Sequence, residues 1–130
     1  MKPRGSRQRV LCIAQSLFRL GTLQDAMRES GYEVLLAFTA DHAVAACISS
    51  ECDAVIVDAE LIRNATSTLA ETLKLARPNI PILLLDDRGD TSRKGQLPKG
   101  IDLAIRGRSP VKVLTGLAAF LGERPHDASR

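Results

Sequence analysis

The most constraining feature of the sequence is a short apolar run that ends in a carboxylate, at residues 53–58. Its centre, Val55, Ile56 and Val57, is β-branched throughout, which favours a strand buried on both faces. Strands of that kind belong to parallel sheets that helices cover on both sides. Asp58 would then emerge at the carboxyl end of its strand, where open α/β sheets place their binding sites.

Four further apolar runs predict strands, at residues 10–14, 33–38, 82–85 and 103–105. Helical spacing between them predicts helices over about residues 17–27, from Thr39 or Asp41 to about residue 48, over about 65–76 after a loop, and over 111–121. This alternation predicts an α/β fold, a flavodoxin-like three-layer sandwich whose five parallel strands take the order 2-1-3-4-5.

The segment at residues 88–100 departs from the alternation. It contains Gly89, Gly95, Pro98 and Gly100, and Leu97 is its only large apolar residue. Glycine and proline disfavour helix interiors, and a single apolar side chain gives no stripe to pack. We therefore expect the fourth helix of the fold to be short or missing.

The 130 residues fit one domain. A basic stretch without apolar periodicity predicts a disordered tail over residues 1–8, followed by the domain over 9–121 and by a polar tail or truncated linker over 122–130. No apolar run reaches the about 20 residues that a membrane span needs. Three cysteines at irregular spacing indicate free thiols in a reducing compartment, so we expect a cytoplasmic protein.

Several stretches carry a likeness to a known family: residues 29–34 (Glu-Ser-Gly-Tyr-Glu-Val), 53–58, 79–85 and 100–102 (Gly-Ile-Asp). In this order and spacing they resemble the chemotaxis-type receiver domain of bacterial response regulators, over roughly residues 9–121. The resemblance implies two-component (phosphorelay) signal transduction, with a histidine kinase or a downstream effector as partner. It also implies that Asp58 is the candidate phosphoacceptor, which would make the chain a phosphoprotein.

The end of the first predicted strand departs from the family's pattern. Receivers usually carry two acidic residues there to hold Mg²⁺, whereas this chain has Ala14 and Gln15, followed by Ser16. Neither a methyl group nor a neutral amide replaces the anionic oxygen ligands that Mg²⁺ prefers. Mg²⁺ therefore stays a candidate cofactor without its usual ligands.

The fourth and fifth predicted strands depart as well. Asp86, followed by Asp87, stands where the family has a Ser or Thr, and an ionised carboxylate accepts hydrogen bonds but cannot donate one to a phosphoryl group. The family's Lys after the fifth strand falls at Gly107, so Arg106 or Arg108 would have to supply the cation. The predicted pocket around Asp58 thus consists of Gln15, Ser16, Asp86, Asp87, Arg106 and Arg108.

Three interpretations of Asp58 follow. It could still accept a phosphoryl group, or it could be a solvated carboxylate in a fold that has lost the chemistry. Asp58 and Asp86 should also lie on neighbouring strands, about 5 Å apart, where two carboxylates can hold a cation. Against such a metal site, one of the two could instead turn toward a nearby arginine.

A late segment is basic although the net charge of the chain is only +3. Its cationic residues are Arg88, Arg93, Lys94, Lys99, Arg106, Arg108 and Lys112. In receivers this region forms the usual partner surface, and here it could meet an acidic protein or a nucleic acid. The chain has no Trp and only 3% aromatic residues, which argues against base stacking.

We therefore weigh three functions. The first is an atypical receiver that binds other proteins and is phosphorylated at Asp58. The second is a pseudo-receiver that binds its partner without phosphorylation, and the third is a nucleic-acid-binding module that uses residues 88–112. A glycine-rich phosphate loop and a nucleophile elbow are both absent, so we expect no enzyme activity. A homodimer is compatible with the sequence.

Overall fold

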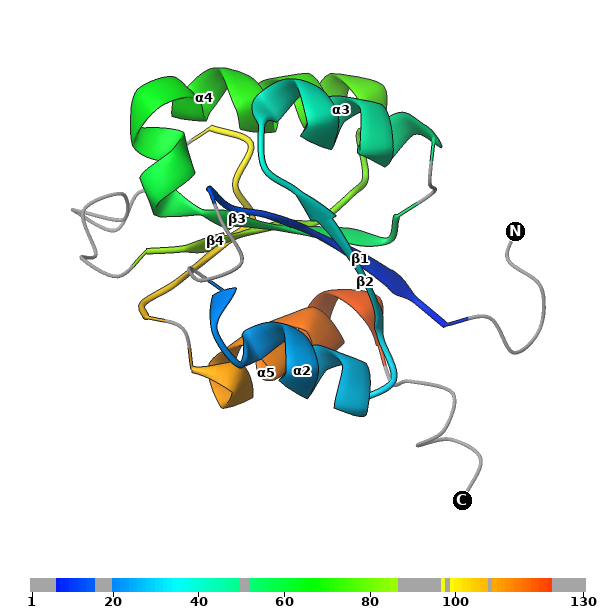
Figure 1. The fold of residues 1–130 in the computed structure, drawn as a ribbon. Helices are drawn as coiled ribbons and strands as arrows, with labels where there is room; N and C mark the ends of the chain where they lie inside the picture. The colour runs from blue at the N-terminus through cyan, green and yellow to red at the C-terminus, as the bar shows by residue number, and fades with distance from the viewer. Residues whose placement is uncertain are drawn as a thin grey trace.

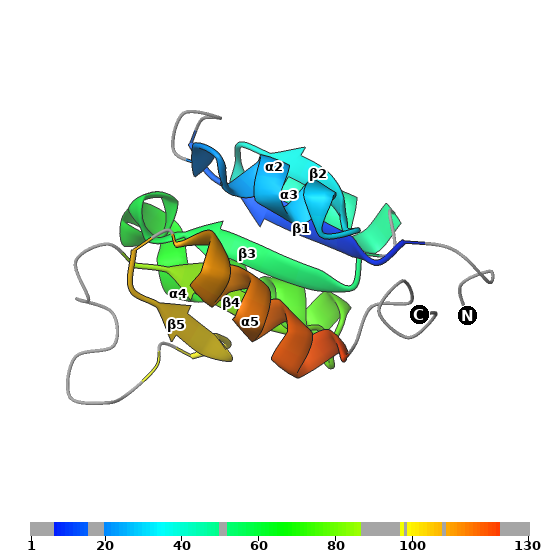
Figure 2. The same cartoon turned by 90° about the horizontal axis from the view of Figure 1, so that it is seen from below.

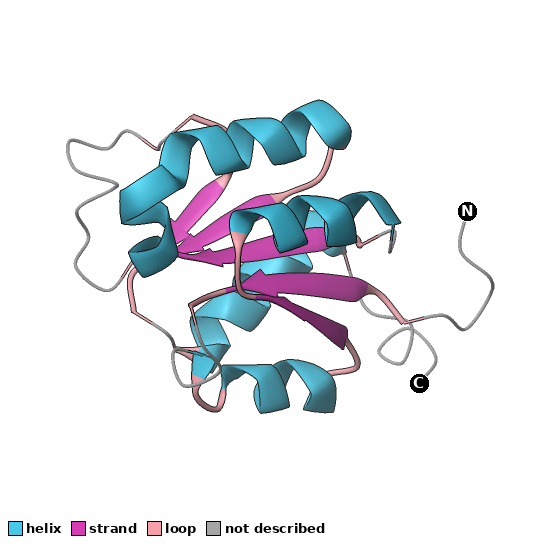
Figure 3. Ribbon diagram, turned by 45° about the horizontal axis from the view of Figure 1, so that its top comes forward, coloured by secondary structure: helices cyan, strands magenta, loops and turns pink. Residues whose placement is uncertain are grey.

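A computed structural model describes residues 7–15, 20–49, 52–86, 97, 99–107 and 109–122, except for the side chains of residues 60–68. A five-stranded parallel sheet, in the order β2-β1-β3-β4-β5, lies between two layers of helices (Figures 1 and 3). The strands are β1 (Arg9–Ile13), β2 (Glu33–Ala37), β3 (Ala54–Asp58), β4 (Ile82–Leu85) and β5 (Leu103–Ile105). The predicted fold class and strand order are confirmed.

The helices form the two outer layers. Helices α3 (Ala40–Ser49) and α4 (Ala59–Ala76) cover one face of the sheet (Figure 1). Helices α2 (Leu23–Glu29) and α5 (Pro110–Leu121) lie side by side across the other (Figure 2). The fourth helix predicted to be short or missing falls mostly on residues 87–96 and 98, outside the described part of the chain.

Strand β3 occupies the centre of the sheet, and all five of its residues are buried. Its side chains alternate between the two faces, as the pleat of a strand requires. Val55 and Val57 pack in the core under α3 and α4, whereas Ala54 and Ile56 pack in the core over α2 and α5. The continuous apolar run in the sequence therefore reflects a strand with a separate core on each side.

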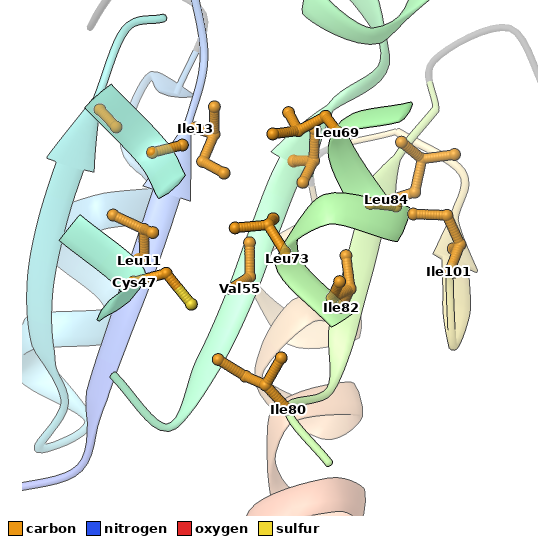
Figure 4. Packing of buried hydrophobic residues seen from close by; sticks show 14 of the residues in the cluster. Leu11, Ile13, Cys47, Val55, Leu69, Leu73, Ile80, Ile82, Leu84 and Ile101 are labelled. Carbon is orange, nitrogen blue, oxygen red and sulfur yellow. The ribbon is translucent and has the colours of Figure 1, made fainter. Parts of the chain in front are cut away.

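The core under α3 and α4 joins the inner faces of both helices to the middle strands. Leu69 and Leu73 of α4 extend toward Val55 and the neighbouring strand residues, and Cys47 of α3 lies over Leu11 (Figure 4). Leu73 is fully buried. Burying a leucine side chain contributes about 1.5–3 kcal/mol, so this stripe is a main anchor of α4.

The start of α4 differs from the prediction. We expected a loop after Asp58 and a helix from about Ala65, but α4 begins at Ala59, directly after β3. The intervening residues contain no Gly or Pro and include the good helix formers Ala, Glu, Leu and Arg. The prediction was wrong because it placed the helix start by its apolar stripe. The predicted inner stripe of this helix was Leu69, Leu73 and Ala76; the two leucines are buried, but Ala76 is exposed and Ala70 is buried instead.

The amino-terminal boundary lies slightly earlier than predicted. The carbonyl of Gln8 accepts a hydrogen bond from Glu33 N–H at 2.9 Å, and Gln8 Nε2 donates to the Leu121 carbonyl at 3.3 Å. Gln8 therefore belongs to the domain and not to the predicted tail. Residues 1–6 and 123–130 lie outside the described part. Among the described helices, none is both long enough and apolar enough to cross a membrane.

Asp102 connects three elements at the start of β5. Its Oδ2 accepts hydrogen bonds from Lys74 Nζ of α4 at 2.7 Å and from Ile82 N–H of β4 at 2.8 Å. Lys74 Nζ also donates to the Ile80 carbonyl at 2.7 Å. The side chains of Lys74 and Asp102 are only 25% and 32% exposed. This partly shielded pair fixes α4 against the entry of β4.

The substitution Asp102→Ala should lower the free energy of unfolding by about 1–3 kcal/mol, because it removes two charge-assisted hydrogen bonds and leaves the Lys74 ammonium without its carboxylate. Urea denaturation monitored by circular dichroism measures the change. Glu33→Ala, which removes the exposed pair with Arg9, is the matched control and should cost no more than about 1 kcal/mol. Equal losses for the two variants would contradict the role of Asp102.

Gly100 allows the chain entering β5 to approach α4 closely. Its φ is +90°, and a Cβ built on it would lie 2.9 Å from the Ala70 Cβ and 3.1 Å from the Ala70 carbonyl carbon. Gly107 has a similar φ of +85° but nothing within 4 Å of such a Cβ. The two glycines thus share the backbone requirement for positive φ and differ in the space around them.

Gly100→Ala should therefore destabilise the protein more than Gly107→Ala does. Both variants incur the cost of placing Ala at positive φ, about 1–2 kcal/mol, and Gly100→Ala must also displace backbone atoms of α4. Thermal or urea unfolding of the two variants side by side isolates the steric part. A Gly107→Ala loss as large as that of Gly100→Ala would show that the close approach to α4 carries no cost.

Candidate functional site

The carboxyl edge of the sheet brings two aspartates together. Asp58 is the last residue of β3 and pairs with Leu85 of β4, so Asp86 follows immediately on the neighbouring strand. The backbone of Asp86 is held on its other side, since its N–H donates to the Ile105 carbonyl at 2.9 Å and its carbonyl accepts from Gly107 N–H at 3.4 Å. Both positions are set by strand pairing in the interior of the sheet.

Asp58 and Asp86 are both buried, each with only 1% of its surface exposed. The interpretation of Asp58 as a solvated carboxylate is therefore wrong. A buried carboxyl group is costly unless it is hydrogen-bonded or paired, and two adjacent carboxyl groups raise that cost through mutual repulsion when both are ionised. The predicted adjacency of their strands is confirmed, with Asp58 ending β3 and Asp86 directly following β4. The burial of the two residues was not predicted.

The end of β1 contributes no acidic side chain to this edge. Ala14 is fully buried, and its N–H donates to the Ala37 carbonyl at 3.1 Å, which extends the pairing with β2. The side chain of Gln15 is exposed. Ser16, the third residue predicted at this end of the site, lies outside the described residues.

The end of β5 places a glycine where the resemblance calls for a lysine. Gly107 follows Arg106, whose side chain is exposed, and the positive φ of Gly107 allows the chain to turn toward α5. Arg106 directly follows β5, so it lies at the same carboxyl edge of the sheet as Asp58. Asp87 and Arg108, also predicted in the pocket, lie outside the described residues.

The described residues do not fit the Mg²⁺ site that the resemblance implies. Mg²⁺ demands near-octahedral coordination by oxygen ligands, and the positions that would supply two of its carboxylates carry the Ala14 methyl and the exposed Gln15 amide. Asp58 and Asp86 supply two buried carboxyl groups at this edge. Within the described part of the chain, no group of three or more His, Cys, Asp or Glu side chains could hold a metal ion.

Two described residues of the predicted basic partner surface, Lys99 and Lys112, lie on opposite sides of the sheet. Lys99 Nζ lies 3.7 Å from Glu71 Oε2 on α4, whereas Lys112 is exposed in the first turn of α5, on the other side of the sheet. Beside Lys112, Val111 is 73% exposed. The predicted residues Arg88, Arg93 and Lys94 lie outside the described part.

Sequence analysis missed a polar cluster at the opposite, amino edge of the sheet. Arg77, which follows α4, donates from Nη1 to the Cys47 carbonyl at 3.3 Å and from Nη2 to the Cys52 carbonyl at 3.0 Å. These acceptors lie 30 and 25 residues away along the chain. No local pattern signals such a contact, because backbone carbonyls of any sequence can accept it.

The chain matches no protein-family model and no curated protein, but it is similar to several solved structures. One is a putative response regulator from Chloroflexus aurantiacus J-10-fl, with a TM-score of 0.78, 23% identity, and coverage of 91% of this chain and 100% of that one. Another is the receiver domain of the sensor histidine kinase PA1611 from Pseudomonas aeruginosa PAO1, with a TM-score of 0.78, 17% identity, and coverage of 91% and 100%. That structure has a magnesium ion coordinated in its active site cleft.

A two-component response regulator from Clostridium difficile is similar with a TM-score of 0.75 at 20% identity, covering 88% of this chain and 96% of that one. Each of these structures agrees with the present one over nearly its whole length. At identities of 17–23% the agreement concerns the arrangement of the backbone. The chain therefore has the flavodoxin-like fold of response regulator receiver domains.

Proposed function

We propose that this chain is a receiver-like module of two-component signal transduction that binds a partner protein without Mg²⁺-dependent phosphorylation of Asp58. The observation that most supports this proposal is the set of residues at the carboxyl edge of the sheet. This edge keeps the buried Asp58 but presents Ala14, an exposed Gln15 and Gly107 where receivers hold a metal ion and a lysine. The proposal places the module in the cytoplasm, where two-component partners exchange signals.

The electrostatics of the edge support this proposal. Phosphoryl transfer to a carboxylate requires cations to neutralise the charge that builds on the transferred group. Asp58 pairs with Leu85 of β4, and the next residue, Asp86, adds a second carboxylate beside Asp58. The resemblance leads us to expect a hydroxyl donor at position 86. A phosphorylated Asp58 would therefore be repelled by the Asp86 carboxylate instead of accepting a hydrogen bond there. Without a neutralising metal, this repulsion opposes both the transfer and the phosphorylated product.

The surface around the start of α5 suits a protein partner. Val111 exposes 73% of its surface beside the exposed Lys112, and the exposed Arg106 precedes the same helix. Phe120, at the far end of α5, is 43% exposed. An exposed apolar side chain with a cation beside it matches a partner with an apolar centre and an acidic rim. A histidine kinase or a downstream effector with such a surface is the partner class we propose.

Acetyl phosphate and Mg²⁺ should leave the intact mass of the wild-type protein unchanged, because the described positions Ala14, Gln15 and Gly107 supply neither acidic metal ligands nor a cation to neutralise the transferred group. Mass spectrometry of the wild type, Asp58→Asn and a conventional receiver domain in the same reaction tests this. The conventional receiver must gain one phosphoryl group for the comparison to count. A gain in the wild type that Asp58→Asn abolishes would contradict the proposal and identify Asp58 as a working phosphoacceptor.

A photo-crosslinking residue at position 111 should capture a two-component signalling protein from cells that express the chain, and Asp58→Asn should leave this capture unchanged. The matched control places the same residue at Ile48, which is 62% exposed on α3, in the other helical layer. Mass spectrometry identifies the captured proteins. Equal capture at both positions, or capture that disappears in Asp58→Asn, would contradict a phosphorylation-independent partner surface on α5.

A further inference from the structure

Two of the three cysteines lie together at the amino edge of the sheet. Cys47 is in the last turn of α3, and Cys52 lies two residues before β3. Both side chains are fully buried, both belong to the core under α3 and α4, and both are free thiols. Figure 4 shows the Cys47 sulfur directed from α3 toward the sheet.

Arg77 fixes the two cysteine backbones relative to each other. One guanidinium group donates to both cysteine carbonyls, at 3.3 Å for Cys47 and 3.0 Å for Cys52. Because a guanidinium is planar and rigid, two bonds from adjacent nitrogens restrict the spacing of their acceptors. The same group brings a permanent positive charge close to the pair, and a positive charge favours a thiolate.

The two thiols have different acidities. The pKa of Cys47 is lowered to about 7, mainly because its sulfur accepts a hydrogen bond from Cys52. Burial raises this pKa, and the positive charge of Arg77 lowers it further. The pKa of Cys52 is raised, first by its hydrogen bond to Cys47 and then by burial. Cys12, buried in the opposite core, has its pKa raised to about 12 by burial. The pair thus contains one thiolate-forming member and one thiol-donating member.

A pocket adjoins this pair on the side of Arg77. It has a volume of about 290 Å³ and is lined by Asp53, Ala76, Arg77, Pro78, Asn79 and Ile80. Arg77 lines the pocket and also donates hydrogen bonds to both cysteine carbonyls, so it links the pocket to the pair. Asp53 also lines the pocket, and its carboxylate accepts a hydrogen bond from Arg9 N–H at 2.7 Å.

We propose that Cys47 and Cys52 form a redox modification site that hydroperoxides oxidise to an intramolecular disulfide. The Cys47 thiolate attacks one peroxide oxygen, so a sulfur–oxygen bond forms, the oxygen–oxygen bond breaks, and the leaving oxygen takes up a proton as water or alcohol. The Cys52 sulfur then attacks the resulting Cys47 sulfenic acid, a disulfide forms, and the hydroxyl leaves as water with the Cys52 proton. Two thiols lose two electrons, and one peroxide gains them.

The disulfide would join the end of α3 to the residues that lead into β3. Cys52 precedes β3 at the amino edge, and Asp58 ends the same strand at the carboxyl edge. The redox site is therefore separate from the candidate phosphoacceptor. It is also independent of the partner surface that the proposed function assigns to α5, so either proposal can fail without the other.

Alkylation of the wild-type protein under denaturing conditions, after treatment of the folded protein with hydrogen peroxide, tests the site. The untreated protein should take up three alkyl groups, one on each cysteine. The treated protein should take up one, on Cys12, and peptide mapping should place a disulfide between Cys47 and Cys52. The oxidation rate should rise as the pH increases through about 7, because Cys47 deprotonates in that range.

Variants of single cysteines separate the roles. Cys12→Ala should still form the disulfide, whereas Cys52→Ser, which keeps a hydrogen-bond donor beside Cys47, should stop at a Cys47 sulfenic acid that dimedone traps. Circular dichroism confirms that each variant is folded. Retention of three alkylatable thiols in the folded wild type after peroxide treatment would overturn the proposal, and so would dimedone labelling of Cys12 in preference to Cys47.

Discussion

The structure depends on the burial of β3 on both of its faces. Each residue of this strand is enclosed, with Val55 and Val57 on one side of the sheet and Ala54 and Ile56 on the other. A strand in that position must have helices above and below it, because either face left open would expose β-branched side chains to water. The three-layer architecture, and with it the position of Asp58 at the end of the strand, follows from this requirement.

The two edges of the sheet carry different chemistry for the same physical reason. Parallel strands leave all their carboxyl ends at one edge and all their amino ends at the other, and loops at both edges gather residues that are distant in sequence. At the carboxyl edge Asp58 and Asp86 lie on neighbouring strands, and the nearby described positions 14, 15 and 107 carry Ala, Gln and Gly. At the amino edge Arg77 gathers Cys47 and Cys52, which creates an environment that favours one thiolate.

Polar side chains that bind backbone groups hold the helices in register with the sheet. Asp102 accepts hydrogen bonds from the side chain of Lys74 and from the backbone of Ile82, and Arg77 donates to two carbonyls. Such contacts satisfy backbone groups at strand and helix ends that no secondary structure pairs. They therefore contribute to stability and at the same time fix where the carboxyl-terminal ends of α3 and α4 lie, at the amino edge of the sheet where the two cysteines are located.

The sequence by itself determined the strands, their order and the position of Asp58, because apolar runs and helical periodicity record which faces must be buried. It also showed Ala14 and Gln15 at the positions where the resemblance implies an acidic pair, which is a matter of residue identity alone. Only the tertiary structure decided that α4 starts directly at Ala59, that Asp58 and Asp86 are buried, and that Arg77 joins two cysteines. Those features depend on contacts between residues far apart in the chain, and local periodicity carries no record of such contacts.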